Sequence, residues 1–276
     1  MENIDKAIQV VAEAEAIIVS AGAGMGVDSG LPDYRGKDGF WNHYPMYREL
    51  GMDYQKATRP SGFLKDPALA WGFYGHCLNL YRNAVPHQGF GALLAIGSAK
   101  PYGYFVFTSN IDGQFEKAGF RAERIHECHG SIHRLQCIYP CCRLTWPADG
   151  IRVEVDPKTM RAAPPFPKCP YCGAIARPNL FAFGDTAFVH EQYTAQAAAF
   201  ATWRQGLQSR KIAVIECGAG TTVPGIRRFG EELCETLEHA TLIRINPTEP
   251  QSRLPDAIAL QATASSALRL LTEGRS

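Results

Sequence analysis

The pattern that most constrains this chain is a short apolar, β-prone run that ends in small or polar residues and then recurs. The first run covers residues 16–20 and leads directly into glycines. Three more runs, at residues 104–110, 212–218 and 241–246, end in the same way. Helical patterns lie between several of these runs, and an amphipathic segment at residues 3–14 precedes them. This alternation predicts an α/β fold with a Rossmann-like parallel sheet covered by helices on both faces, in which ligands bind at the carboxyl ends of strands.

Two stretches interrupt this alternation. Residues 36–87 are rich in aromatic side chains and turns and predict a helical insertion, whereas residues 133–176 hold two cysteine groups and predict a small zinc-binding module. A chain of 276 residues fits one large α/β domain that carries such a module. We therefore expect a single domain whose Rossmann-like part covers residues 1–35, 88–132 and 177–276.

The composition excludes several classes of protein. A hydrophobic fraction of 46%, a charged fraction of 20% and a net charge of +1 are ordinary for a globular protein, and no run of like charge favours direct nucleic-acid binding. The first residues carry acids early and lack the pattern of a secretory signal. No segment approaches the roughly 18 uninterrupted apolar residues of a membrane span. We expect a cytoplasmic protein without membrane contact, and the oligomeric state stays open.

The first glycine turn follows the first strand directly and suits a phosphate, because backbone amides at a helix N-terminus bind anions. Its candidate cofactor-contacting residues are Gly22, Ala23, Gly24 and Gly26. The alternative is a turn whose glycines serve only tight packing. Downstream, Arg35 can hold a phosphate or order the loop, and Tyr34 can cover a reactive sugar face. With Asp33, Arg35 can equally form a surface ion pair of little energetic value.

Polar residues also end the second strand. Ser109, Asn110 and Asp112 offer hydrogen bonds to ribose hydroxyls or a carboxamide, and the alternative for Asn110 or Asp112 is a helix N-cap. A second glycine turn, Gly218, Ala219 and Gly220, follows the third strand, and Asn246 ends the fourth. Two such turns on one sheet suit a dinucleotide.

His129 is the candidate proton acceptor. Histidine has an unperturbed pKa of about 6.5 and suits proton abstraction at neutral pH. Most histidines are nevertheless structural or exposed, and His129 is one of eight in the chain. Only its position among the other motifs favours a catalytic function.

The cysteine spacing predicts a closed, structural zinc site. Cys169 and Cys172 are two residues apart, which lets both thiolates bind one tetrahedral ion. The other pair is Cys137 with Cys141, and Cys142 is an alternative to Cys141. An odd total of nine cysteines, five of them in two close groups, favours thiolates over a disulfide framework.

Taken in order, these motifs resemble those of the sirtuins, the NAD-dependent protein deacylases, over about residues 15–250. The family's GAG-x-S and GIPDFR motifs are similar to residues 22–26 and 30–35, and its TQNID motif is similar to residues 108–112. Its catalytic HG pair resembles His129 and Gly130. The zinc module, the RP pair and the FGE motif resemble the cysteine groups, residues 177–178 and residues 183–185.

The resemblance implies a reaction in which the acyl oxygen of a modified lysine attacks the nicotinamide ribose carbon of NAD and nicotinamide leaves. His129 then deprotonates a ribose hydroxyl, and the products are free lysine and O-acyl-ADP-ribose. It also implies that Asn110 and Asp112 organise the ribose pocket and that Tyr34 shields the reactive carbon. The implied substrate-contacting residues are Tyr74 in the acyl pocket and, on a strand-like segment that pairs with an acylated peptide, Phe183 and Gly184.

Four positions depart from the family pattern. Gly26 replaces a serine, Ser109 replaces a glutamine, and Gly218–Gly220 replaces GTS, so polar side chains toward the cofactor are lost. Cys77 replaces the arginine that members use for acidic acyl groups, and we therefore expect a neutral acyl group. Alternatives to deacylation are ADP-ribosyl transfer or NAD hydrolysis, and a noncatalytic NAD or ADP-ribose sensor.

Overall fold

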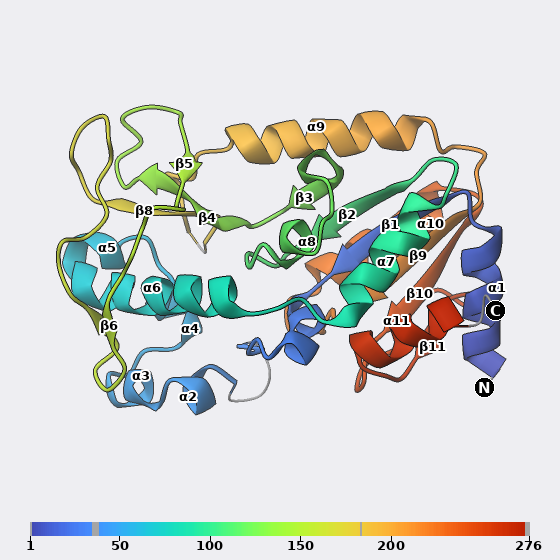
Figure 1. Ribbon diagram of the computed structural model, residues 1–276, viewed down its shortest axis with the longest axis horizontal. Helices are drawn as coiled ribbons and strands as arrows, with labels where there is room; N and C mark the ends of the chain where they lie inside the picture. Colours follow the sequence, from blue (N-terminus) through green and yellow to red (C-terminus); the bar gives the residue numbers. More distant parts are fainter. Residues whose placement is uncertain (1, 35–38, 183, 274–276) are drawn as a thin grey trace.

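The computed structural model describes residues 2–34, 39–182 and 184–273 (Figure 1). All four strands predicted from the sequence form, and they lie in one sheet. These strands are β1 (Ala16–Ala21), β2 (Tyr104–Thr108), β9 (Ile212–Cys217) and β10 (Ala240–Ile245). Two short strands that the sequence did not reveal extend the sheet at its edges, β3 (Ile125–Glu127) and β11 (Ile258–Leu260).

The strand order explains where a ligand can bind. The sheet runs β11-β10-β9-β1-β2-β3, and every pairing in it is parallel. The connections reverse direction between β1 and β9, which pair from Ala16 opposite Ile212 to Ala21 opposite Cys217. A crevice opens outside the carboxyl ends of strands at such a reversal. Both predicted glycine turns leave the sheet at this point.

Helices cover both faces of the sheet, as predicted (Figure 1). Ile17 and Val19 of β1 face one core, and Ile18 faces the other, because side chains alternate along a strand. The first core is closed by α1 (Glu2–Glu13), α7 (Gln88–Ser98), α8 (Gln114–Lys117) and α11 (Ala264–Glu273). The second is closed by α9 (Glu191–Gln205) and α10 (Gly225–Thr236).

A third apolar core lies beside the sheet and holds the predicted helical insertion together with the cysteine module. Trp71 is fully buried there and donates to the carbonyl of Ala176, which ties the insertion to the module. The helices of the insertion are α2 (Gly39–His43), α3 (Pro45–Glu49), α4 (Tyr54–Ala57), α5 (Gly62–Lys65) and α6 (Pro67–Asn83). The module contains β4 (Gly130–Cys137), β5 (Trp146–Pro147), β6 (Val155–Asp156), β7 (Arg161–Ala162) and β8 (Ala176–Leu180).

Two short 3₁₀ helices complete the described elements, η1 (Ala23–Ser29) and η2 (Ala122–Arg124). The first glycine turn leads into η1, which has the tighter 3₁₀ geometry. Across the ranges that the structure describes, none of the helices combines the length and the apolar character needed to cross a bilayer.

Candidate active site

Two adjoining cavities occupy the crevice at the reversal of strand order. The first, of about 350 Å³, lies between the sheet and the helical insertion, and the second, of about 500 Å³, lies over the glycine turns. Ala23, Ser109 and Val223 line both cavities. Residues predicted for proton transfer and ribose binding line the first cavity: Asn110, Asp112 and His129. Most residues predicted for the cofactor line the second: Gly22, Ala23, Gly24, Asp33, Ser109, Gly218, Ala219, Gly220 and Asn246.

Asn110 and Asp112 are buried where β2 ends. The Asn110 side chain donates to the carbonyl of Gly22 at 3.0 Å and so ties β2 to the first glycine turn. Asp112 accepts at 2.9 Å from the backbone N–H of Gln114, the first residue of the short helix α8, whose N-cap position is Gly113. Its contact with a ribose stays a prediction. Burial raises the pKa of the Asp112 carboxyl to about 6, so this group changes charge near neutral pH.

His129 is half-buried in the turn that joins β3 to β4. The turn is fixed by backbone contacts, since the N–H of Phe181 donates to the carbonyl of His129 at 3.0 Å. Gly130 follows with φ +75°, and a Cβ there would lie 2.1 Å from the carbonyl oxygen of Asn179. Glycine is therefore required after the histidine, because the turn is left-handed and presses against β8.

The two glycine turns touch each other, which gives their glycines a packing role. A Cβ on Gly24 would lie 2.7 Å from the Cα of Gly218, and one on Gly218, at φ +63°, would lie 2.2 Å from the Met25 nitrogen. The amides of Gly22 and Gly24 donate to the carbonyls of Cys217 and Gly218, both at 3.0 Å. These two amides are consequently engaged within the protein, whereas both residues line the second cavity, so their contact with the cofactor stays a prediction.

The second turn keeps amides for a ligand. Within the described part of the chain, the N–H groups of Ala219 and Gly220 have no hydrogen-bond partner, although both residues line the second cavity. Gly218 precedes them in the left-handed conformation, and successive amides after such a residue form an anion-binding concavity. This turn can therefore hold a phosphate of the cofactor.

Aromatic side chains build the wall of the first cavity opposite the sheet. The Tyr34 hydroxyl lies 2.8 Å from the Tyr44 hydroxyl and 3.6 Å from the Cys77 sulfur. Tyr74 is buried, stacks on Phe63 and donates to the carbonyl of Thr58 at 2.9 Å. Tyr34, Tyr74 and Cys77 all line the cavity, and its described lining contains no arginine or lysine. The wall is apolar, and the hydroxyls of Tyr34 and Tyr74 already have partners within the protein.

The segment after β8 borders the same cavity through Gly184. It is held by a buried ion pair in which Arg177 donates to both carboxylate oxygens of Asp185, at 2.9 and 2.7 Å.

Two predicted site residues, Arg35 and Phe183, lie outside the described residues. Gly26 is buried under Leu31, whose side chain a Cβ at Gly26 would meet at 3.1 Å, and it is not part of either described cavity lining.

The cysteine module brings four sulfur atoms together, and none of the four residues is in the described lining of either cavity. The sulfurs of Cys137, Cys141, Cys169 and Cys172 all lie within 4.8 Å of one another. Two of the separations, Cys137 to Cys172 and Cys141 to Cys169, are 3.6 Å. Ligands on a tetrahedral zinc with bonds of about 2.3 Å lie about 3.8 Å apart, so this set fits the ion. Among the described residues the cluster contains Cys141 and not Cys142, which favours Cys141 as the fourth ligand and leaves the ligand set a prediction.

Sequence reasoning missed cavity residues that come from the helical insertion and from the loop after β10. Thr58, Phe73 and Tyr81 line the first cavity, and Glu249 lines the second. The insertion's aromatic richness is visible in the sequence, but its direction toward the crevice is not. Glu249 follows the strand-ending Asn246 by three residues, and that position was the one available signal.

The fold and the crevice define a Rossmann-like protein with a dinucleotide site beside a four-cysteine module. A protein-family model described as "Sir2 family" matches residues 22–202. The chain belongs to the Sir2 family.

Named relatives agree with this assignment. The chain is 33% identical over 184 residues to "NAD-dependent protein deacylase 1" of Archaeoglobus fulgidus, a match that covers 66% of this chain and 65% of the relative. It is 28% identical over 253 residues to the "NAD-dependent protein deacylase" of Aeropyrum pernix, with 90% and 87% covered. The aligned stretch therefore spans just under two thirds of the first relative's length and most of the second's.

Solved structures share the fold. A complex of a Sir2 homologue with NAD has a TM-score of 0.68 at 23% identity and covers 98% of this chain and 93% of that one. A triple mutant of Sir2 homologues, in complex with 2′-O-acetyl-ADP-ribose, has a TM-score of 0.68 at 25% identity, with 98% and 96% covered.

Proposed function

We propose that this protein is an NAD-dependent protein-lysine deacylase that releases nicotinamide and O-acyl-ADP-ribose. The observation that carries the proposal is the first cavity, in which His129, Asn110 and Asp112 meet at the reversal of strand order. The second cavity adjoins it and offers room and free amides for the rest of a dinucleotide. The names of the relatives and the complexes of the structural neighbours support the same reaction.

Each group in the first cavity has a distinct function in this proposal. NAD is a co-substrate and supplies the glycosidic bond that breaks when the acyl oxygen attacks. His129 accepts the proton of a ribose hydroxyl, so that this oxygen attacks the acyl carbon; one water molecule is then consumed as free lysine leaves and O-acyl-ADP-ribose forms. Asn110 and Asp112 orient the ribose, and Tyr34 helps to exclude water from the reacting carbon. An acylated peptide enters beside Gly184 and pairs its backbone with the segment after β8.

Zinc has a structural function in this proposal. The thiolates of Cys137, Cys141, Cys169 and Cys172 would fill all four coordination positions of the ion, so it would take no part in the reaction. We also propose that the whole chain forms one catalytic domain, because residues from the sheet, the helical insertion and the turn before β4 line one cavity.

The apolar wall of the first cavity favours a neutral acyl group. Cys77 stands where acidic-acyl enzymes of the family carry arginine, and burial raises the pKa of its thiol to about 11, so it stays uncharged. A succinyl carboxylate would have to be buried without a cation in the described lining, which costs several kcal/mol. We expect kcat/KM for an acetyl-lysine peptide to exceed that for the matched succinyl-lysine peptide by at least about tenfold. Equal or faster desuccinylation would contradict this specificity.

Incubation with NAD and an acetyl-lysine peptide tests the function. Mass spectrometry follows the peptide, and chromatography follows nicotinamide and acetyl-ADP-ribose. The wild-type protein should form all three products in equal amounts, and His129→Ala should slow their formation by about 10²–10⁴-fold. His239→Ala is the matched control, because that histidine is exposed in the loop before β10.

Two other outcomes would replace the proposal. Nicotinamide release without peptide deacetylation identifies an ADP-ribosyltransferase or an NAD hydrolase. ADP-ribose binding without turnover of NAD identifies a noncatalytic sensor.

A further inference from the structure

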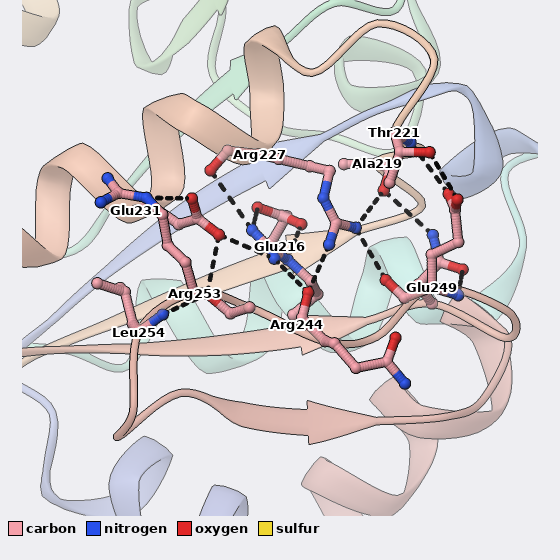
Figure 2. Close-up of polar contacts among 12 residues, drawn as sticks. Glu216, Ala219, Thr221, Arg227, Glu231, Arg244, Glu249, Arg253 and Leu254 are labelled. Atoms are coloured by element: carbon pink, nitrogen blue, oxygen red, sulfur yellow. Dashed lines mark hydrogen bonds and ion pairs between the residues drawn. The ribbon is translucent and has the colours of Figure 1, made fainter.

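One carbonyl of the second glycine turn is held from two sides. The oxygen of Ala219 accepts from Arg227 Nη1 at 3.1 Å and from Asn246 Nδ2 at 3.1 Å (Figure 2). The Ala219–Gly220 peptide is trans, so its N–H points opposite to its carbonyl. The two donors therefore fix the direction of the unpartnered Gly220 amide, which lies in the lining of the second cavity.

The same arginine holds the loop on the other side of this cavity. Arg227 Nη1 also donates to the carbonyl of Glu249 at 2.8 Å, and Nη2 donates to the carbonyl of Gln251 (Figure 2). Glu249 in turn accepts from the backbone and hydroxyl of Thr221, at 3.0 and 2.6 Å. One guanidinium thus joins the turn after β9 to the loop after β10. Arg227 itself is absent from the described lining of both cavities.

A network of buried charged residues contacts the backbone of Arg227 and of the loop after β10. Arg244 and Glu216, on neighbouring strands, are 1% and 0% exposed and form a two-bond ion pair. Arg244 also donates to the carbonyl of Gln251 at 2.7 Å and to that of Arg227 at 3.4 Å. Glu231 joins the network through Arg244 and accepts from Ser252 at 2.9 Å. The loop after β10 is therefore held by directional bonds at Gln251 and Ser252, and Leu254 further along it packs against the second core.

We infer that Arg227 is a positioning residue for the part of NAD that lies in the second cavity. Its guanidinium sets the separation and orientation of the two loops without touching the ligand, and this inference rests on the proposed NAD-dependent function. The reacting bond lies in the other cavity, beside His129. Loss of Arg227 should therefore weaken cofactor binding and leave the chemical step and the peptide site unaffected.

Three variants and two measurements test the inference. Arg227→Met keeps the length of the aliphatic stem and removes every donor, and Arg227→Lys keeps the charge but cannot span three carbonyls with one ammonium. Arg228→Met is the matched control, because its exposed side chain follows on the same helix. Calorimetry measures the Kd for ADP-ribose, and steady-state kinetics separates KM for NAD, KM for peptide and kcat.

For Arg227→Met we expect the Kd for ADP-ribose and the KM for NAD to rise about tenfold, while kcat and the peptide KM change less than about twofold. Arg227→Lys should lie between this variant and the wild type, and Arg228→Met should match the wild type. A fall in kcat together with a rise in both KM values would show that Arg227 has only a structural function and would overturn the inference. An unchanged Kd for ADP-ribose and an unchanged KM for NAD would overturn it as well. If the wild type binds ADP-ribose but never turns over NAD, the proposed function fails and the Kd comparison still decides the positioning function. If it binds no ADP-ribose, both fail.

Discussion

Glu127, at the end of β3 next to the turn that contains His129, is a buried acid that the proposed reaction does not use. Its side chain is 6% exposed, and its backbone N–H donates to Gln196 at 3.0 Å. Burial, with a smaller contribution from Glu116, raises the pKa of the Glu127 carboxyl to about 8. The folded protein therefore keeps this carboxyl protonated at neutral pH, whereas the unfolded chain does not.

This difference predicts a stability that falls as pH rises. Between about pH 4.5 and 8 the unfolded state binds fewer protons than the folded state, so the free energy of unfolding decreases with pH by an amount on the order of 4 kcal/mol from this group. Glu127→Gln keeps a neutral, hydrogen-bonding side chain and should remove this contribution. Urea unfolding at pH 5.5 and pH 8.5 measures it, with the exposed Glu238→Gln as control. The same pH dependence in wild type and Glu127→Gln would show that Glu127 is ionised in the fold.

At the scale of elements, the contact between the two glycine turns holds the crevice in shape. Gly218 has both a left-handed backbone and a close neighbour, since a Cβ there would lie 2.2 Å from the Met25 nitrogen. Gly220, two residues later, would meet only the Glu249 carboxylate at 3.7 Å, an ordinary contact. Alanine at these two positions should therefore have different effects on the free energy of unfolding.

Gly218→Ala should lower the free energy of unfolding by roughly 2–4 kcal/mol, because the turn must open to admit the methyl group. Gly220→Ala should change it by less than about 1 kcal/mol. Chemical denaturation of both variants measures the difference. Equal effects of the two substitutions on the free energy of unfolding would mean that the turns separate at little cost. The contact between them would then not stabilise the fold.

The cysteine cluster is the other element-scale feature, and its ligand set is open to direct test. Wild-type protein should bind one zinc per chain, and Cys141→Ser or Cys172→Ser should lose it, because each removes one of four clustered sulfurs. Cys142→Ser should retain the metal. Elemental analysis after dialysis gives the zinc content, and a chelator should lower the Tm of wild type and Cys142→Ser alike. Zinc loss in Cys142→Ser with retention in Cys141→Ser would reverse the assignment.

At the scale of the whole molecule, the crevice joins parts that fold around different cores. Asn110 reaches the first cavity from the sheet, whereas Phe73 and Tyr81 reach it from α6 and the third core. A ligand in the first cavity therefore contacts both parts at once. Binding to the folded state alone stabilises it by mass action.

ADP-ribose should raise the Tm of the protein. At a concentration of 100 times its Kd, a ligand that binds only the folded state adds about 2.7 kcal/mol, which is a shift of roughly 4–6 °C for a domain of this size. Differential scanning fluorimetry over a concentration series measures the shift, and Gly218→Ala serves as a variant with a distorted site. A Tm independent of ADP-ribose in the wild type would contradict cofactor binding at the crevice.

The sequence by itself determined the sheet, the position of its glycine turns and the zinc-type cysteine spacing. These features depend on neighbours in the chain, because strand and helix periodicity, turn residues and ligand pairs are local patterns. The edge strands β3 and β11 were not predicted, because three residues each are too few to show a local periodicity. The motif order then placed Asn110, Asp112 and His129 in one site.

Only the tertiary structure decided how the site is assembled. It groups Cys141, and not Cys142, with the other three cysteines of the cluster. Aromatic side chains of α6 line the first cavity. The amides of Gly22 and Gly24 form hydrogen bonds in the contact between the two turns. The tertiary structure also places Arg227 between two loops that are more than twenty residues apart. Such contacts join segments distant in sequence, and they form only when burial of the cores compensates the entropy of closing the loops between them.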